Sequence, residues 1–457
     1  MDYISTRNNQ SKFTFKDVFL KGLAEDGGLY VPQKLFKFNE TEIKKFKNLR
    51  YEELAVEIIH RFVGSFIDKN ILSELINKSY STFRDKNVIK FSDVGKFKIM
   101  ELFHGPTLAF KDIAMQFIGN LYDYYLNHNE TKINIIVATS GDTGAAAIDA
   151  LAGKKNLNIF VLHPHNKISP VQRRIMTTYD DKNVFNIAVN GNFDDCQNLV
   201  KSMFTDLKFS RSINMSGVNS INWARIISQS VYYFYAYFKL ENENVLNFSV
   251  PTGNFGDIYA GYLAKKIGLP IGKLIVATNK NDILHRAISK GDYKIRKVEE
   301  TFSPSMDIQI ASNFERLLYD LNNNNSEITL ENMKQIKNNS YQLDQDMIKK
   351  INQNFLSESL SEEETLKQIK ETYSENNYVL DPHTAIGLGA AKKLNIENCI
   401  VLATAHPAKF PDAITKSISQ KIDLPKELVK INNKKENFHI IDNDLEKIKN
   451  YIKESIQ

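Results

Sequence analysis

The sequence predicts an α/β protein whose parallel sheets are covered by helices on both faces. Three times, the chain repeats a β-rich run, a loop of small or turn-forming residues, and a segment with helical periodicity. The β-rich runs of these units span residues 133–138, 246–250 and 399–403 and contain no charged residue. Such runs, alternating with helices, are typical of parallel sheets that are buried on both faces. Further β-rich runs occupy residues 159–162, 184–189 and 274–278.

The helical segments follow the loops directly. In the first unit the helix is expected over residues 145–151, and in the second over residues 258–267. The second helix should stop at Gly268, because Pro270 lies just beyond it and glycine followed by proline is a common helix ending. A third helix is expected shortly after Pro407.

Length and composition indicate an ordinary globular protein. The chain has 457 residues, enough for about three domains. Hydrophobic residues make up 42% and charged residues 25%, which excludes a disordered or fibrous protein. The net charge of +5 is small for this length, so neither nucleic acid nor a membrane surface is expected as a partner.

Cysteine content and hydropathy favour a cytoplasmic location. The two cysteines, Cys196 and Cys399, exclude a disulfide framework and suit a reducing compartment. Residues 1–15 lack the apolar core of a secretory signal. The most apolar stretch, residues 231–238, is far shorter than the roughly 20 residues of a membrane span. No cluster of residues has the spacing of metal ligands, so no metal site is expected.

Residues 253–257 form a glycine-containing loop between a β-rich run and a helix. The free N–H groups at a helix start attract anions, and two glycines allow the backbone to approach a ligand closely. Asp257 should contribute its backbone N–H, with its side chain turned aside as a cap. The alternative is a tight helix entry that binds nothing. The spacings typical of dinucleotide and nucleoside triphosphate sites are absent from the sequence.

Residues 140–144 form a second loop of this kind, with two hydroxyls and two glycines before a run of three alanines. Its small residues fit an anion site at the helix start and equally a helix N-cap. Both interpretations are compatible with each other.

The third loop precedes an amphipathic helix and carries Lys111. Apolar residues recur with helical spacing at Phe110, Ile113, Ala114, Phe117, Ile118 and Leu121. Thr107 is expected as the N-cap, which places Lys111 in or next to the first turn. A cation is disfavoured there, and burial together with the helix dipole would leave a neutral amine able to form a Schiff base. The alternative is an exposed lysine, against which Phe110 and the Gly-Pro-Thr turn argue.

A reactive lysine and a phosphate-binding loop are what a pyridoxal phosphate enzyme needs. On these motifs the chain resembles the threonine synthase family in its microbial and fungal form. The motifs are AEDGGLYVP (24–32), HGPTLAFKD (104–112), TSGDTG (139–144), NSINWAR (219–225), GNFGD (253–257), ATNKND (277–282), SPSMDI (303–308) and TAHPAKF (404–410).

The resemblance implies a fold type II pyridoxal phosphate enzyme, similar to the β subunit of tryptophan synthase. Two open, twisted, mostly parallel sheets covered by helices are then expected, together with an N-terminal module. The module would span residues 1–95, and a first lobe with the Schiff-base lysine and the SGDTG loop residues 96–215. The second lobe, with the phosphate loop, would span residues 216–457 and include a helical insertion at about 320–375.

The resemblance also implies residue roles. Lys111 would be the Schiff-base lysine and would carry the substrate's protons. The cofactor phosphate would bind to Gly253, Asn254, Phe255, Gly256 and Asp257. Thr404 would meet the pyridine nitrogen with its hydroxyl, which leaves the ring a milder electron sink than an aspartate partner would.

For the substrate, the implied α-carboxylate site is the loop of Ser140, Gly141, Asp142 and Thr143. Candidates for the substrate phosphate are Asn222, Arg225, Asn279 and Lys280. For Arg225 a salt bridge beneath the ring of Trp223 is an equal alternative.

The reaction implied by the resemblance is γ-elimination of phosphate from O-phospho-L-homoserine and addition of water, which gives L-threonine. The alternatives are another fold type II enzyme, such as a threonine or serine dehydratase, and a non-catalytic homologue that binds pyridoxal phosphate. Residues 26–30 and 303–308 favour the synthase. A monomer without the plant-type allosteric region is expected.

Overall fold

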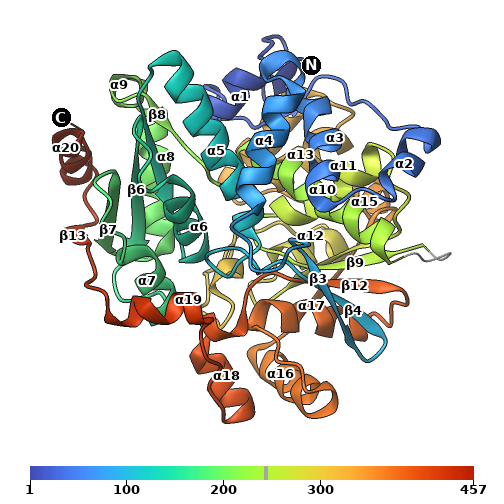
Figure 1. Ribbon diagram of the computed structural model, residues 1–457. Helices are drawn as coiled ribbons and strands as arrows, with labels where there is room; N and C mark the ends of the chain where they lie inside the picture. The colour runs from blue at the N-terminus through green and yellow to red at the C-terminus, as the bar shows by residue number, and fades with distance from the viewer. Residues whose placement is uncertain (241–244, 457) are drawn as a thin grey trace.

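The computed structural model describes residues 1–240 and 245–456 and contains two large sheets of mainly parallel strands (Figure 1). The first has the order β11 (Phe355–Ser359), β10 (Leu274–Thr278), β9 (Asn247–Pro251), β12 (Cys399–Ala403), β4 (Phe97–Glu101) and β3 (Lys90–Val94). The second has the order β13 (His439–Asp442), β7 (Val184–Asn190), β6 (Leu157–Pro164), β5 (Ile133–Ala138) and β8 (Met215–Ser216). Within these sheets only the β3–β4 pair is antiparallel. The predicted α/β fold is confirmed.

Helices cover both sheets. The N-terminal part contains a two-stranded sheet, β1 (Tyr3–Ser5) and β2 (Tyr30–Pro32), with α1 (Phe15–Lys21), α2 (Glu40–Phe46), α3 (Tyr51–Val63) and α4 (Lys69–Tyr80). Next come α5 (Lys111–Asn129), α6 (Asp142–Leu151), α7 (Pro170–Thr177), α8 (Phe193–Thr205), α9 (Leu207–Ser212), α10 (Trp223–Lys239), α11 (Gly256–Lys266) and α12 (Ile283–Lys290). The last are α13 (Phe314–Leu321), α14 (Ser326–Lys337), α15 (Gln345–Asn352), α16 (Glu362–Asn376), α17 (Pro382–Lys393), α18 (Pro411–Ile418), α19 (Lys426–Val429) and α20 (Leu445–Ser455).

The six β-rich runs of the sequence are all strands, because each is buried between helices. In β5 every residue is buried, as expected for a central parallel strand. The apolar stretch at residues 231–238 lies in α10, which packs against α3, α5 and α11. None of the helices in the described ranges is long and apolar enough to cross a membrane.

The inserted segment at about 320–375 is only partly as predicted. It contains α14, α15 and α16, but residues 355–359 form strand β11, which pairs in parallel with β10 from Leu274↔Phe355 to Thr278↔Ser359. The predicted helical segment therefore also contains a strand that the sequence analysis did not predict. The strand has mixed polarity because it lies at the edge of its sheet, where one side is partly exposed.

The division into three parts stays a prediction. Strand β4, just after the expected boundary at residue 95, pairs in parallel with β12 and so shares a sheet with β9 and β10. We propose that the hairpin of residues 90–101 is best grouped with the second lobe.

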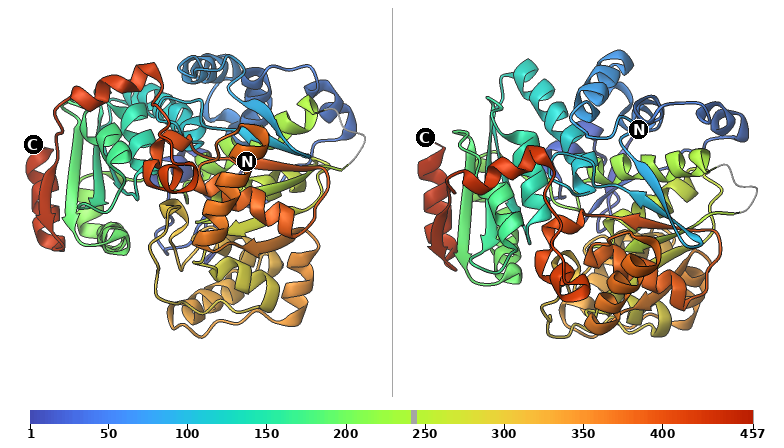
Figure 2. Two further views of the ribbon diagram at one scale, coloured as in Figure 1. Left: turned by 90° about the horizontal axis from the view of Figure 1, so that it is seen from below. Right: turned by 60° about the horizontal axis from the view of Figure 1, so that its bottom comes forward.

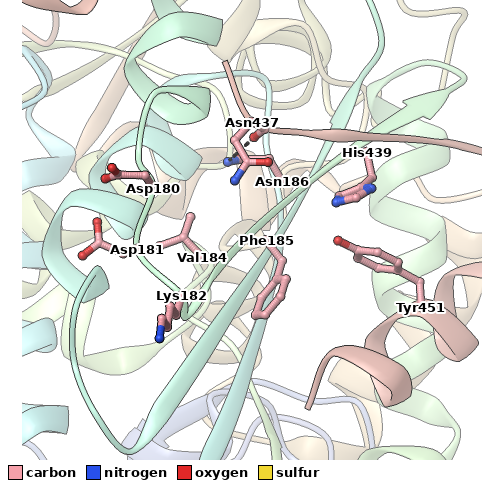
Figure 3. A pocket seen from close by; sticks show the side chains of 9 residues that line it. All are labelled: Asp180, Asp181, Lys182, Val184, Phe185, Asn186, Asn437, His439 and Tyr451. Carbon is pink, nitrogen blue, oxygen red and sulfur yellow. Dashed lines mark hydrogen bonds between the residues drawn. The ribbon is translucent and has the colours of Figure 1, made fainter. Parts of the chain in front are cut away.

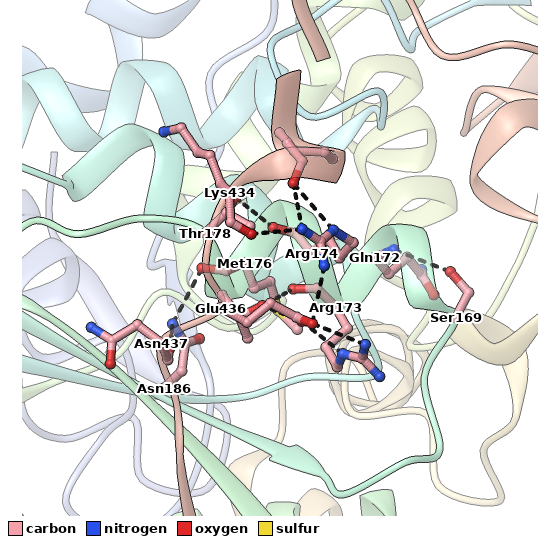
Figure 4. A network of polar contacts seen from close by, with 12 residues as sticks. Ser169, Gln172, Arg173, Arg174, Met176, Thr178, Asn186, Lys434, Glu436 and Asn437 are labelled. Atoms are coloured by element: carbon pink, nitrogen blue, oxygen red, sulfur yellow. Dashed lines mark hydrogen bonds and ion pairs between the residues drawn. The ribbon is translucent and has the colours of Figure 1, made fainter. Parts of the chain in front are cut away.

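The C-terminal strap, residues 426–456, runs along the five-stranded sheet and adds β13 to its edge (Figure 2). Two arginines of α7 hold it. Arg173 donates to Glu436 through Nε and Nη2, at 2.8 and 3.0 Å, and Arg174 donates to the same carboxylate at 3.2 Å (Figure 4). Arg174 also donates to the carbonyl oxygens of Ile431, Asn432 and Lys434.

Replacing Glu436 with alanine should loosen this strap, because it leaves two guanidinium groups and the Thr177 hydroxyl without their shared acceptor. We expect a loss of about 1–3 kcal/mol of stability, measured by denaturant unfolding, and faster proteolysis within the strap. Glu446→Ala is the control, since that side chain is 72% exposed and its ion pair with Lys449 should contribute little stability. Equal stability of the two variants would contradict the role of Glu436.

Candidate active site

The loop that carries Lys111 is tied to the end of strand β12. The backbone N–H of Phe110 donates to the Thr404 carbonyl at 2.9 Å, and the N–H of His406 donates to the Leu108 carbonyl at 3.0 Å. Two backbone hydrogen bonds therefore fix the start of α5 relative to Thr404, which is 5% exposed at the end of its strand. The structure thus brings the loop of Lys111 and the end of β12, at Thr404, together, although they lie nearly 300 residues apart in the sequence.

Helix α5 begins at Lys111 itself, so the expected first-turn position is confirmed. The expected N-cap is wrong. Phe110 is the N-cap and makes no side-chain cap, whereas Thr107 donates to the Asp112 carboxylate through its hydroxyl (2.6 Å) and its N–H (2.8 Å). Asp112, the second residue of the helix, thus folds the loop back onto the helix start.

Lys111 is buried, with 8% of its surface exposed, so the alternative of an exposed lysine is wrong. Its Nζ lies 3.4 Å from Oδ2 of Asp142 and 4.5 Å from the centre of the Phe110 ring. Burial lowers the pKa of the Lys111 amine, and the charges of Arg225 and Lys409 lower it further, while Asp142 acts in the opposite direction. A lowered pKa favours the neutral, nucleophilic amine.

The glycine loop at residues 253–257 opens helix α11. Phe255 is the N-cap in the left-handed conformation (φ 62°) and makes no side-chain cap, which leaves the first turn open to an anion. A Cβ on Gly253 would lie 2.4 Å from the Ser305 carbonyl oxygen, so only glycine fits. Asn313 supports the loop, since its N–H and Nδ2 both donate to the Asn254 carbonyl, at 3.0 and 3.1 Å.

The side chain of Asp257 is turned aside, but it is not a cap. It accepts hydrogen bonds from the hydroxyls of Tyr232 and, at 2.9 Å, Tyr233, two buried residues of α10. Burial raises the pKa of Asp257 to about 6, although the two hydroxyls and the nearby charges of Lys111 and Arg225 act against this rise. Its carboxylate is thereby bound by tyrosines and does not occupy the helix start.

These features fit pyridoxal phosphate. A buried amine with a lowered pKa suits the aldehyde, and an uncapped helix start whose glycine cannot carry a Cβ suits the phosphate. A buried hydroxyl at the end of β12 suits the pyridine nitrogen.

The loop at residues 140–144 is organised by a residue that precedes it. The hydroxyl oxygen of Thr139 accepts hydrogen bonds from the N–H groups of Gly141 and Gly144, both at 2.9 Å. Gly141, at φ 129°, is the N-cap of α6 and makes no side-chain cap. Ser140 is therefore not the cap residue.

Asp142 forms ion pairs with two lysines, Lys409 and Lys111. Lys409 approaches its Oδ1 to 2.6 Å, Gln172 donates to the same oxygen at 2.8 Å, and Lys111 faces Oδ2. Burial on its own raises the pKa of Asp142, but Lys409 and Lys111 outweigh it and hold the pKa well below its usual range. Sequence reasoning missed Gln172 and Lys409, although Lys409 lies in one of the quoted motifs.

Three of the four expected phosphate ligands are engaged elsewhere. Asn222 caps α10 and donates to the carbonyls of Phe19 and Gly217. The Asn279 amide donates to Thr301, Ser303 and Asp307. Lys280 forms an ion pair with Glu299 at 2.9 Å. The structure therefore gives the two asparagines structural roles, because no amide hydrogen is left for a ligand.

Arg225 is different. It is 2% exposed, and none of the described residues accepts a hydrogen bond from its Nε or Nη1. Burial lowers its pKa to about 10. The alternative of a salt bridge beneath Trp223 is wrong, because the cation over that ring is Arg316, at 5.2 Å. A buried guanidinium with free donors beside Lys111 suits an anionic group of the substrate.

A polar hollow on the five-stranded sheet is not part of this site (Figure 3). It is lined by residues that include Asp180, Asp181, His439 and Tyr451, and by none of the expected site residues. Its two carboxylates suit a phosphorylated ligand poorly.

Replacing Gly253 with alanine should weaken cofactor binding at least about tenfold, because the added Cβ forces the loop away from Ser305. Gly256→Ala is the comparison, since its Cβ would meet Asn313 Nδ2 at a more tolerable 3.2 Å and should have a smaller effect. The affinity of each cofactor-free variant for pyridoxal phosphate is measured by titration followed by absorbance. If Gly253→Ala binds pyridoxal phosphate as tightly as the unchanged protein, this loop is not the phosphate site.

Comparisons with known proteins agree with this geometry. Family models match for "Threonine synthase N terminus" at residues 2–80, "Pyridoxal-phosphate dependent enzyme" at 97–334 and "Threonine synthase, C-terminal" at 384–452. A threonine synthase of Pseudomonas aeruginosa is 44% identical over 99% of this chain and 98% of its own. The solved structure of pyridoxal phosphate-bound threonine synthase from Brucella melitensis matches 100% of this chain and 99% of its own, with a TM-score of 0.94 and 43% identity. The structure of threonine synthase from yeast matches 100% of this chain and 98% of its own, with a TM-score of 0.92 and 41% identity. The chain belongs to the threonine synthase family of fold type II pyridoxal phosphate enzymes.

Proposed function

We propose that this protein is a lyase that converts O-phospho-L-homoserine and water into L-threonine and phosphate, the last step of threonine biosynthesis. The observation that carries the proposal is the pairing of a buried amine, Lys111, with a buried guanidinium, Arg225, that has free donors. The amine suits the cofactor and the guanidinium suits a second phosphate, which the alternative substrates threonine and serine do not have.

The roles of the residues follow from their positions. Lys111 holds the cofactor and moves protons between the substrate's carbons, which its place at the start of a rigid helix makes possible. Bound pyridoxal phosphate supplies an electron sink for charge that develops next to the substrate's amine. Gly253 to Asp257 hold its phosphate, and Thr404 meets its pyridine nitrogen with a hydroxyl.

The substrate is bound between two groups of residues. The loop of Ser140, Gly141, Asp142 and Thr143 receives the α-carboxylate. Arg225 receives the phosphate and stabilises its charge as the carbon–oxygen bond breaks. Lys280 is a second candidate for binding the substrate phosphate. Its ion pair with Glu299 is partly exposed, so the amine can exchange Glu299 for a phosphate.

We further propose that the protein works as a monomer in the cytoplasm, on small molecules and without nucleic acid or a membrane. Cys196 and Cys399 are buried and free, which supports a reducing compartment. The small net charge of +5 supports the absence of polyanionic partners.

Two substrates offered separately test the proposal. With O-phospho-L-homoserine, phosphate and threonine should form in equal amounts, measured by a phosphate assay and amino-acid analysis. With threonine alone, little 2-oxobutyrate should form. If 2-oxobutyrate from threonine is the main product, the protein is a dehydratase. If neither substrate reacts although the cofactor is bound, it is a non-catalytic homologue.

A further inference from the structure

Lys409 is a second buried lysine in the site. It ends a short 3-10 helix, Pro407–Lys409, and none of its surface is exposed. Its Nζ forms the 2.6 Å ion pair with Asp142 and donates to the Thr107 carbonyl at 2.9 Å. Its own carbonyl accepts from the Ser169 hydroxyl at 2.9 Å. Lys409 therefore links the loop of Lys111, the loop of Asp142 and the start of α7.

Asp142 occupies an unusual place for a carboxylate. It is 2% exposed and lies in the loop proposed to receive the substrate's α-carboxylate, where a free negative charge would repel the ligand. Of its two cationic partners Lys409 is the nearer, at 2.6 Å against 3.4 Å for Lys111. Because Lys111 is used by the cofactor, Lys409 is the partner that remains available to Asp142 throughout the reaction.

The same pair acts on Lys111. The charged groups that face the Lys111 amine are Asp142 from α6, Arg225 from α10, Asp257 from α11 and Lys409 itself, and His383 from α17 also faces Asp142. Loss of Lys409 removes one cation near the amine and leaves Lys111 as the one lysine among the described residues that forms an ion pair with Asp142. Both changes favour the protonated amine.

We infer that Lys409 is a positioning residue that neutralises Asp142, so that the loop of residues 140–143 accepts a carboxylate and Lys111 stays reactive. The part that concerns the substrate rests on the proposed function, whereas the part that concerns Lys111 does not.

The first test follows covalent attachment of pyridoxal phosphate to the cofactor-free full chain, by absorbance, as a function of pH. In Lys409→Met the profile should move to higher pH by about one unit, since the amine deprotonates later. In Asp142→Asn the profile should move to lower pH. Lys111 then faces the charge of Lys409 without a carboxylate beside it, so its amine loses the proton more easily. The control is Lys449→Met, which breaks a more exposed ion pair between α20 and Asp206, outside the site, and should leave the profile unchanged.

Shifts of opposite sign support the inference, and no shift or shifts of the same sign overturn it. If Lys409→Met does not fold, the direction of the shift in Asp142→Asn decides. This readout needs no substrate, so it succeeds or fails independently of the proposed reaction.

The second test measures KM and kcat for O-phospho-L-homoserine. Lys409→Met should raise KM at least about tenfold, with a smaller effect on kcat, because Asp142 then repels the substrate's carboxylate. Adding Asp142→Asn should restore part of the loss, since no charge is left to repel it. A double variant no better than Lys409→Met would mean that Lys409 acts only as a tether between loops.

Discussion

Replacing Lys111 with alanine is expected to abolish both turnover and the visible absorption of the bound cofactor. The variant has no amine at the start of α5 to hold the cofactor or to move the substrate's protons. A fall in kcat/KM of at least about 1,000-fold is expected from the loss of both functions. Enzyme assays and absorbance spectra of the purified variant measure the effect.

Lys265→Ala is the matched control. Burial also lowers the pKa of Lys265, but this lysine lies in the last turn of α11 and donates to the Gly272 carbonyl. Its replacement should leave absorption and turnover as they are. Turnover that survives in Lys111→Ala would refute the assignment of Lys111.

Replacing Arg225 with methionine should lower the catalytic activity without lowering the stability of the protein. The guanidinium is buried without an ion pair to any described residue, so its removal relieves a desolvation cost. The cofactor-free variant should therefore be at least as stable as the parent protein. For O-phospho-L-homoserine, kcat/KM should fall about 100-fold, or ~3 kcal/mol, because a buried charge that binds phosphate is lost.

Arg316→Met is the matched control, since Arg316 is equally buried and burial also lowers its pKa to about 10. Its donors, however, are used by the Tyr30 and Ile221 carbonyls and by Asn313, which supports the phosphate loop. This variant should lose about 3 kcal/mol of stability or more and bind the cofactor weakly. If Arg225→Met is destabilised to the same extent and keeps its kcat/KM, Arg225 is a structural residue.

Local sequence signals were enough to predict most of the central strands and the position of Lys111. Strands β5, β10 and β12 begin and end where their apolar runs do, because burial between helices leaves little room for polar residues. Lys111 could be placed because a helical stripe starts beside it. Strands β11 and β13 were missed because their residues are partly exposed and carry no such signal.

Pairings between distant segments could not be predicted. Thr107 looked like an N-cap because the capping pattern is local, whereas its real acceptor is set by the fold of the whole loop. Nothing near Asp142 in the sequence indicates that Lys409 neutralises it from 267 positions away. Asn222 and Asn279 stood in matching motifs, but motifs do not distinguish a ligand from a residue that holds the ligand's loop.

Borohydride reduction of the cofactor-loaded protein, followed by digestion and mass spectrometry of the labelled peptide, tests the central claim most directly. Reduction fixes the cofactor to whichever amine holds it. The site contains two buried amines, Lys111 and Lys409, and their different surroundings predict that only Lys111 carries the label. A label on Lys409 or on any other side chain would contradict the account, as would a protein that takes up no pyridoxal phosphate.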